Sequence, residues 1–224
     1  MNQLIFDFAD HSYPGFDKFL GQSNGELLDV LQNQQHQQPF VFVWGQEGSG
    51  KSHLLRAWVA QAGQAGLRAA YVDAKSNSLG DWARQLDCVA VDQIEHLSAE
   101  EQIKLFALFN HFRHSGHGSL LLSATVPPAQ LVLREDLRTR MGLCVVYQIQ
   151  PLSDEEKADA LMSMAQARQL PVDEEVFRYL LNHWSRDLDR LIHMLDTLDD
   201  YALAMGRRIT LPLLRGLLKQ QETL

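Results

Sequence analysis

Cysteine is scarce in this 224-residue chain, which contains only Cys88 and Cys144. Two cysteines cannot build the set of several disulfides that holds small secreted domains together. Each lies in an apolar stretch that is typical of a strand, so we interpret both as small buried side chains. The nine histidines form no HExxH motif and accompany no CxxC pair, so the sequence contains no recognisable zinc motif.

Long apolar runs and an excess of positive charge are also missing. No apolar stretch approaches the ~20 residues of a membrane-spanning helix, and the N-terminus lacks the basic segment of a secretion signal. We therefore expect a cytoplasmic protein without membrane contact. The net charge of -8 gives no general attraction to the phosphates of nucleic acids. Protein partners are the better expectation.

Apolar strand patterns alternate with helical patterns over the first part of the chain. Strands are expected in PFVFVWG, AAYVDA, CVAVD, GSLLLSAT and LCVVYQI, and helices at 25–34, 52–62 and 98–116. This alternation predicts an α/β fold with right-handed crossovers and a parallel five-stranded sheet that carries helices on both faces.

Strand patterns stop after Pro151, and amphipathic helices follow. Ser153 and Glu156 form a capping box, and helices are expected at 154–168, 174–184, 187–205 and 211–220. We therefore predict three parts: a flexible leader (1–13), a nucleotide-binding α/β domain (14–151) and a small all-α lid domain (152–224).

The segment GQEGSGKS matches the P-loop pattern G-x-x-x-x-G-K-[ST] and follows a strand and precedes a helix, as the motif requires. Gly45, Gly48 and Gly50 allow backbone N–H groups to turn towards phosphate oxygens. Lys51 adds a point charge, the Ser52 hydroxyl can bind Mg²⁺, and the helix N-terminus favours anions. The chain is therefore expected to bind a nucleotide.

Asp92, which ends the strand CVAVD, is the expected partner of Ser52 at the magnesium. Gln93 follows it, where an ATPase usually carries a carboxylate. A neutral amide can orient the attacking water, but it cannot accept its proton at neutral pH. Glu95 is an alternative source of that carboxylate. Intrinsic hydrolysis is therefore expected to be weak.

With these motifs established, the chain resembles AAA+ proteins, and in particular the ATPase core of the DnaA family, over nearly its whole length. The resemblance of FDKFLGQSN makes Phe19 and Leu20 candidate adenine contacts. LLLSATVPPAQL resembles the sensor-1 strand, with Thr125 where Asp is common. LRTRM resembles the segment of the arginine finger, which makes Arg140 the candidate, and SRDLDRL resembles the sensor-2 helix, with Arg186 reaching the nucleotide. Each arginine has a simpler alternative, a solvated surface charge.

The chain carries neither the DNA-reading helix-turn-helix nor the N-terminal interaction domain of DnaA, a layout that resembles the Hda-type, DnaA-related regulators. That resemblance implies ADP or ATP with Mg²⁺ as ligand, DnaA as partner and no sequence-specific DNA binding. It also implies an activity, namely that such a regulator, with the DNA-loaded sliding clamp, stimulates hydrolysis of DnaA-bound ATP. AAA+ sites usually lie between neighbours, so we also expect a homo-oligomer that associates through the Arg140 face.

The leader sequence QLIFDF is similar to the family's clamp-binding peptide Q-L-x-L-x-[LF]. Gln3, Leu4, Phe6 and Phe8 would contact the sliding clamp, the beta subunit of DNA polymerase III, with three apolar anchors entering a preformed pocket. Two other functions remain open. One is a self-sufficient ATPase of the helicase-loader type, and the other is a nucleotide-gated scaffold without a catalytic contribution.

Overall fold

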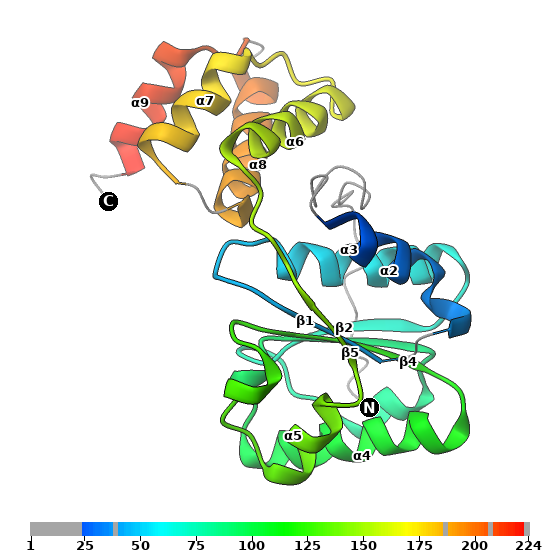
Figure 1. Cartoon of the computed structure of the whole chain (residues 1–224). Coiled ribbons are helices and arrows are strands. Elements are labelled where there is room, and N and C mark those ends of the chain that lie inside the picture. The colour runs from blue at the N-terminus through cyan, green and yellow to red at the C-terminus, as the bar shows by residue number, and fades with distance from the viewer. Residues whose placement is uncertain (1–23, 38–39, 186–187, 206–207, 222–224) are drawn as a thin grey trace, which may run out of the picture.

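The computed structural model describes residues 24–37, 40–185, 188–205 and 208–221 (Figure 1). Within these ranges all five predicted strands are present. They are β1 (Phe40–Trp44), β2 (Ala69–Asp73), β3 (Cys88–Asp92), β4 (Ser119–Ala124) and β5 (Val145–Gln148). The helices between them are α2 (Gly25–Gln37), α3 (Lys51–Gln64), α4 (Ala99–Ser115) and α5 (Glu135–Met141). Short 3₁₀ turns η2 (Asp81–Gln85), η3 (Ile94–His96) and η4 (Pro128–Gln130) complete this part.

The strands form one parallel sheet in the order β2-β3-β4-β1-β5. Helices α2 and α3 lie on one face of the sheet, and α4 and α5 lie on the other (Figure 1). The predicted α/β fold is therefore confirmed. Because the strands are parallel, the P-loop after β1 and Asp92 at the end of β3 lie at the same edge of the sheet, on either side of β4. Ligands of open parallel sheets bind at this carboxyl edge.

Alternation along the strands divides the apolar core into two layers. Val41 and Val43 of β1 pack into the layer with α3, whereas Phe42 packs into the layer with α4, and all three are fully buried. Side chains of successive strand residues point to opposite faces, so a strand that is apolar throughout needs cover on both. The continuous apolar runs of the sequence correspond to this arrangement.

Among the described residues, four helices follow the sheet. They are α6 (Asp154–Ala167), α7 (Glu174–His183), α8 (Leu188–Met205) and α9 (Leu211–Gln221). The predicted capping box starts α6, since the Glu156 N–H donates to Ser153 Oγ and the Ser153 N–H donates to the Glu156 carboxylate. The apolar core of these helices and the α3 layer form one cluster, which also contains Ile149 and Leu152. The lid therefore extends from the same side of the sheet as α3 (Figure 1).

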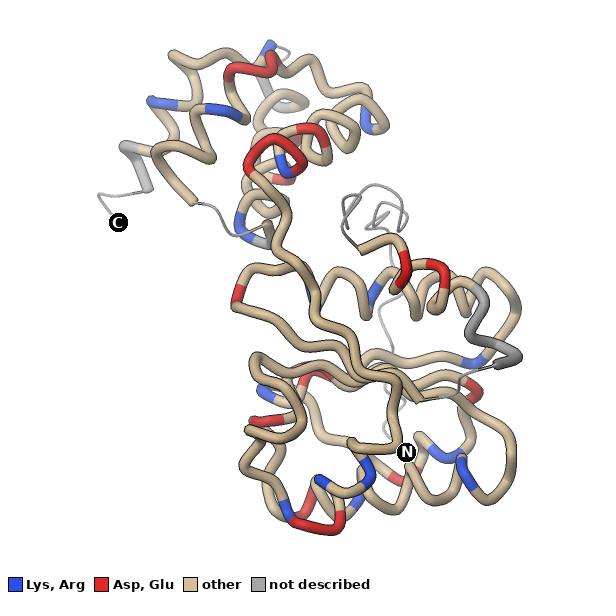
Figure 2. Tube along the Cα trace, in the orientation of Figure 1, with Lys and Arg blue, Asp and Glu red and all other residues tan. Residues whose placement is uncertain are grey.

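Charge is mixed rather than segregated. Figure 2 shows acidic and basic residues interspersed over both the sheet domain and the lid. None of the helices in the described parts of the chain combines the length and the apolarity that crossing a bilayer requires.

Candidate nucleotide-binding site

Two glycines, Gly45 and Gly50, shape the P-loop. Any other residue at either position would introduce strain. Gly50 precedes α3 in the left-handed conformation, with φ 91° and ψ 10°, where a side chain costs energy. At Gly45, an added Cβ would lie 2.8 Å from the carbonyl oxygen of Ile149 and 2.9 Å from Ser49 Oγ. The loop can therefore pass close to the start of the lid segment only because position 45 has no side chain.

Lys51, the first residue of α3, is almost fully buried and folds back over the loop. Its Nζ donates to the carbonyl oxygens of Gly45 and Gln46, at 2.7 Å each, and to Ser49 Oγ at 3.4 Å. Burial lowers the pKa of Lys51, and the negative charges of Asp92, Glu95 and Glu47 oppose this shift. An ammonium bound mainly by neutral carbonyls is prepared to interact with an anion.

Asp92 is fully buried, and both of its carboxylate oxygens accept hydrogen bonds. The hydroxyl of Tyr71 on β2 donates to Oδ2 at 2.7 Å, and the hydroxyl of Ser123 on β4 donates to Oδ1. Burial and the charge of Asp92 raise the pKa of Tyr71, so this phenol remains protonated and a donor. Ser123 in turn accepts from the Gln93 N–H at 2.9 Å. Asp92 is thus held rigidly at the edge of the sheet.

The magnesium expected at Ser52 and Asp92 fits the chemistry of these oxygen donors. Among the described residues, no group of three or more His, Cys, Asp or Glu side chains is placed to hold a metal ion. Mg²⁺ does not need such a group, because it keeps several waters and binds through one or two protein oxygens plus substrate phosphates. Ser52 and Asp92 would hold it in this way, with Asp92 acting through water.

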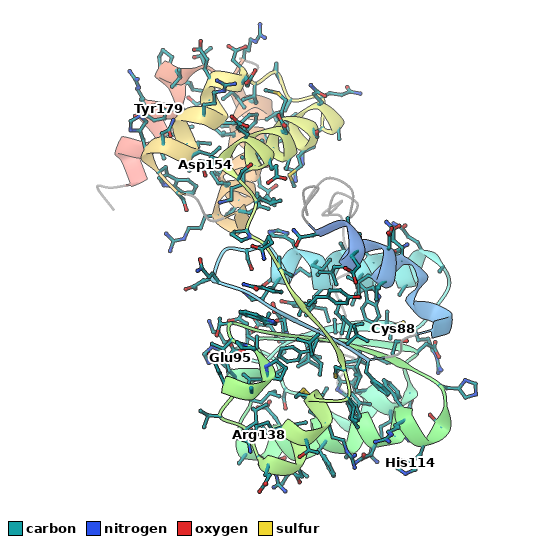
Figure 3. The ribbon with its side chains drawn as sticks, viewed as in Figure 1. Cys88, Glu95, His114, Arg138, Asp154 and Tyr179 are labelled. Atoms are coloured by element: carbon teal, nitrogen blue, oxygen red, sulfur yellow. The ribbon has the colours of Figure 1, made fainter. Side chains whose placement is uncertain are left out.

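A cleft of about 430 Å³ opens above the P-loop. That volume is in the usual range for small-molecule sites, ~300 to 1,000 Å³. The cleft is lined by the P-loop and the start of α3, by Gln93, Glu95 and His96 after β3, by Thr125 after β4, and by Leu188 of the lid. The lid therefore contributes one wall of the site. Figure 3 labels Glu95 at this edge of the sheet.

Several residues of the cleft were not identified from the sequence. Glu47, His53, Lys75 and His96 all line it. Lys75 comes directly after β2, and the meeting of parallel strand ends at one edge was a signal that could have identified it. Gln93 takes a left-handed backbone conformation, with φ 56°, which is unusual for a residue other than glycine.

Arg140, the predicted arginine finger, lies on α5 and not in this cleft. Its guanidinium carbon lies 5.5 Å from the centre of the Phe106 ring on α4. Its Nε is buried and makes no hydrogen bond to the described residues. By contrast, Arg134 forms a salt bridge of 2.9 Å with Asp136, whereas no ion pair within the described ranges involves Arg140.

The remaining predicted site residues lie outside the described residues. They are Gln3, Leu4, Phe6 and Phe8 of the leader, the adenine candidates Phe19 and Leu20, and the lid arginine Arg186. Leu188, the first described residue after Arg186, does line the cleft. The start of α8 therefore reaches the nucleotide site.

Comparison with known proteins gives matches over both parts of the chain. Residues 154–218 match the family model described as Hda, lid domain. The crystal structure of domain III of the replication initiation protein DnaA from Thermotoga maritima is 22% identical, covers 94% of this chain and 97% of its own, and superposes with a TM-score of 0.75. AMPPCP-bound DnaA from Aquifex aeolicus is 21% identical over 85% of this chain and 67% of its own, with a TM-score of 0.65. A solution structure of a Neisseria meningitidis protein is 56% identical over 64% of this chain and 95% of its own, with a TM-score of 0.47.

The parallel sheet, the P-loop between β1 and α3 and the helical lid over the cleft define an AAA+ protein of the P-loop class. Within that class, the match of α6 to α9 to the Hda lid is more specific. Residues 154–218 belong to the Hda lid family, and the whole chain shares its fold with domain III of DnaA.

Proposed function

We propose that this DnaA-related regulator of replication initiation promotes hydrolysis of DnaA-bound ATP by supplying Arg140 in trans. The observation that carries the proposal is the state of Arg140, which is held against an aromatic ring, has its Nε buried, and has no carboxylate partner among the described residues. A guanidinium in this state retains its positive charge for an anion of another molecule. An arginine supplied in trans can raise the rate of phosphoryl transfer by ~10³ to 10⁵.

Nucleotide binding is the second part of the proposal. The P-loop geometry, the buried Lys51 and the size of the cleft support ADP or ATP as the ligand. AMPPCP is bound in the DnaA of Aquifex aeolicus, which shares the fold. Gly45, Gly48, Gly50, Lys51 and Ser52 would bind the phosphates. The ligand would fix the lid on the sheet domain, because Leu188 and the P-loop line the same cleft.

Recruitment is the third part. The leader peptide Gln3–Phe8 would bind the sliding clamp on DNA through Leu4, Phe6 and Phe8, and would bring Arg140 close to DnaA. This step depends only on the sequence similarity of QLIFDF. Recruitment and catalysis are therefore assigned to different residues. The leader peptide would bring the protein to the clamp, and Arg140 would raise the rate of hydrolysis of DnaA-bound ATP.

The test measures hydrolysis of radiolabelled ATP pre-bound to DnaA, with DNA-loaded clamp present throughout. Arg140→Ala should remove at least ~100-fold of the stimulation. Arg138→Ala is the matched control, because Arg138 is an exposed arginine two residues away on the same helix (Figure 3). Full stimulation by Arg140→Ala, with clamp and DnaA binding intact, would refute the role of Arg140.

Removal of residues 1–13 tests recruitment separately. The truncated chain should lose stimulation at low protein concentration and recover it at high concentration, because Arg140 is still present. A self-sufficient ATPase would instead hydrolyse ATP rapidly without DnaA. A non-catalytic scaffold would need the leader and would not need Arg140.

A further inference from the structure

Glu95 has an arrangement that differs from every other carboxylate of the cleft. Its Oε1 accepts two hydrogen bonds from one residue, Thr125, whose N–H lies at 2.9 Å and whose hydroxyl oxygen lies at 2.8 Å. Its Oε2 is shut off from solvent and has no hydrogen-bond partner among the described residues. Burying a carboxylate oxygen without a hydrogen-bond partner costs free energy. In the observed conformation of Glu95, only Oε1 has hydrogen-bond partners, so this conformation is not the most favourable one for the carboxylate.

The other acidic groups near the phosphate loop are arranged differently. Asp92 is held by Tyr71 and Ser123 through both oxygens, and Glu47 is exposed on the loop. Gln93 has no charge. Glu95 is therefore the described carboxylate of the cleft that retains an unused oxygen and is also partly shielded from water.

We propose that Glu95 is the carboxylate that activates water in this chain's own nucleotide site, and that Thr125 holds it in a resting position. In the active position, the water oxygen forms a bond to the γ-phosphorus of ATP while its proton passes to Glu95 Oε2. The bond from the γ-phosphorus to the bridging oxygen breaks, and ADP leaves with the electron pair. In the resting position Oε1 is bonded to Thr125 and Oε2 is shut off from solvent, so hydrolysis by the chain is slow. Catalytic hydrogen bonds often form only in the substrate complex, which is consistent with this geometry.

Thr125 is placed to hold Glu95 reversibly, and in this sense we call it a latch. It comes directly after β4 and is exposed, whereas Glu95 belongs to the 3₁₀ turn η3 after the neighbouring strand β3. The two residues are thus joined across the carboxyl ends of two adjacent strands, at the mouth of the cleft. A small shift of either strand end, or competition by a phosphate oxygen for the Thr125 donors, would release the carboxylate.

The experiment measures single-turnover hydrolysis of radiolabelled ATP by the full-length chain, without any partner protein, so its result does not depend on Arg140. Glu95→Gln keeps the shape of the side chain and removes the base, and it should slow hydrolysis by ~100-fold. Thr125→Val keeps the backbone N–H but removes the hydroxyl, and it should speed hydrolysis roughly tenfold, because a hydrogen bond to a charged group is lost. The double variant should be as slow as Glu95→Gln. Glu100→Gln, on the surface of α4, controls for the change in charge.

A second readout does not depend on turnover. Amide hydrogen exchange at Thr125 should become faster when a non-hydrolysable ATP analogue is added, because the Glu95 carboxylate leaves the Thr125 N–H. Exchange that stays equally slow in the complex would overturn the latch. A Glu95→Gln rate equal to that of the wild type, or a wild-type rate no higher than that of Lys51→Ala, would overturn the role of Glu95. Thr125→Val at the wild-type rate would overturn the restraint by the hydroxyl.

Discussion

The guanidinium carbon of Arg140 lies 5.5 Å from the centre of the Phe106 ring, so a residue of α5 is fixed by a residue of α4. The ring is only partly buried, and it packs against the α4 core layer as well as lying near the arginine. An arginine loses much side-chain entropy when it is ordered. Phe106 restricts Arg140 before any partner arrives, so less of that entropy is lost on binding.

This contact leads to a prediction about Phe106. Phe106→Leu should lower stimulation of DnaA-bound ATP hydrolysis by ~2- to 30-fold, which corresponds to the range of a cation–π interaction. Phe106→Tyr keeps an aromatic face and should retain most of the stimulation. The maximal rate should change while the protein concentration for half-maximal stimulation does not. Equal loss in both variants would show that Phe106 matters only for packing.

The same substitution, glycine to alanine, should have opposite effects on the free energy of unfolding at Gly45 and at Gly63. Gly45→Ala places a methyl group within 3 Å of the Ile149 carbonyl and of Ser49, so it should lower the free energy of unfolding by ~1 to 3 kcal/mol. Gly63→Ala, near the end of α3, meets no atom within 4 Å and should raise it by up to ~1 kcal/mol, because alanine favours the helix. Denaturant midpoints measured at an unchanged m-value compare the two. A neutral Gly45→Ala would mean that the loop can move away from the start of the lid.

The strands, the P-loop and the lid helices could be predicted because each is encoded locally. An apolar run between turn residues predicts a covered strand, and the spacing of Gly45, Gly50, Lys51 and Ser52 is set by a loop of eight residues. The helix α5 was missed. It has only seven residues, and Arg134 at its N-cap makes no side-chain capping bond.

The partners of Asp92 could not be predicted for a different reason. Tyr71 and Ser123 lie 21 and 31 residues away from it and reach it only because β2 and β4 are placed near β3. Strand order is a property of the whole sheet and leaves no local pattern in the sequence. The link between Glu95 and Thr125 has the same origin, since 30 residues separate them. The presence of Gln93 in the sequence therefore did not reveal the contacts of the neighbouring Asp92 and Glu95.

The two cysteines should be unreactive at neutral pH. Burial raises the pKa of Cys88 to about 11 and that of Cys144 to about 12, and only the thiolate reacts. The folded state therefore binds more protons than the unfolded state above the ordinary thiol pKa of ~8.5, so stability should fall as the pH rises from there. Iodoacetamide at pH 8 should modify the native chain at least ~100-fold more slowly than the chain unfolded in guanidinium. Cys88 is buried and Cys144 is partly buried, and fast labelling of the native chain would contradict the raised pKa values of the two thiols.

Lys51 should control nucleotide affinity through its charge. Lys51→Ala should weaken binding of ADP and ATP by ~10- to 100-fold, because charge-assisted hydrogen bonds to phosphate are lost, whereas Lys104→Ala on the surface of α4 should have no effect. Burial lowers the pKa of Lys51 from its ordinary value of 10.5, so its charge is lost at a pH below that value. Affinity measured by calorimetry should therefore begin to fall at a pH below 10.5 in the wild type. In Lys51→Ala it should be weak and independent of pH over the same range, because the titrating group is gone. An identical decline in both proteins would assign the pH dependence to another group of the cleft.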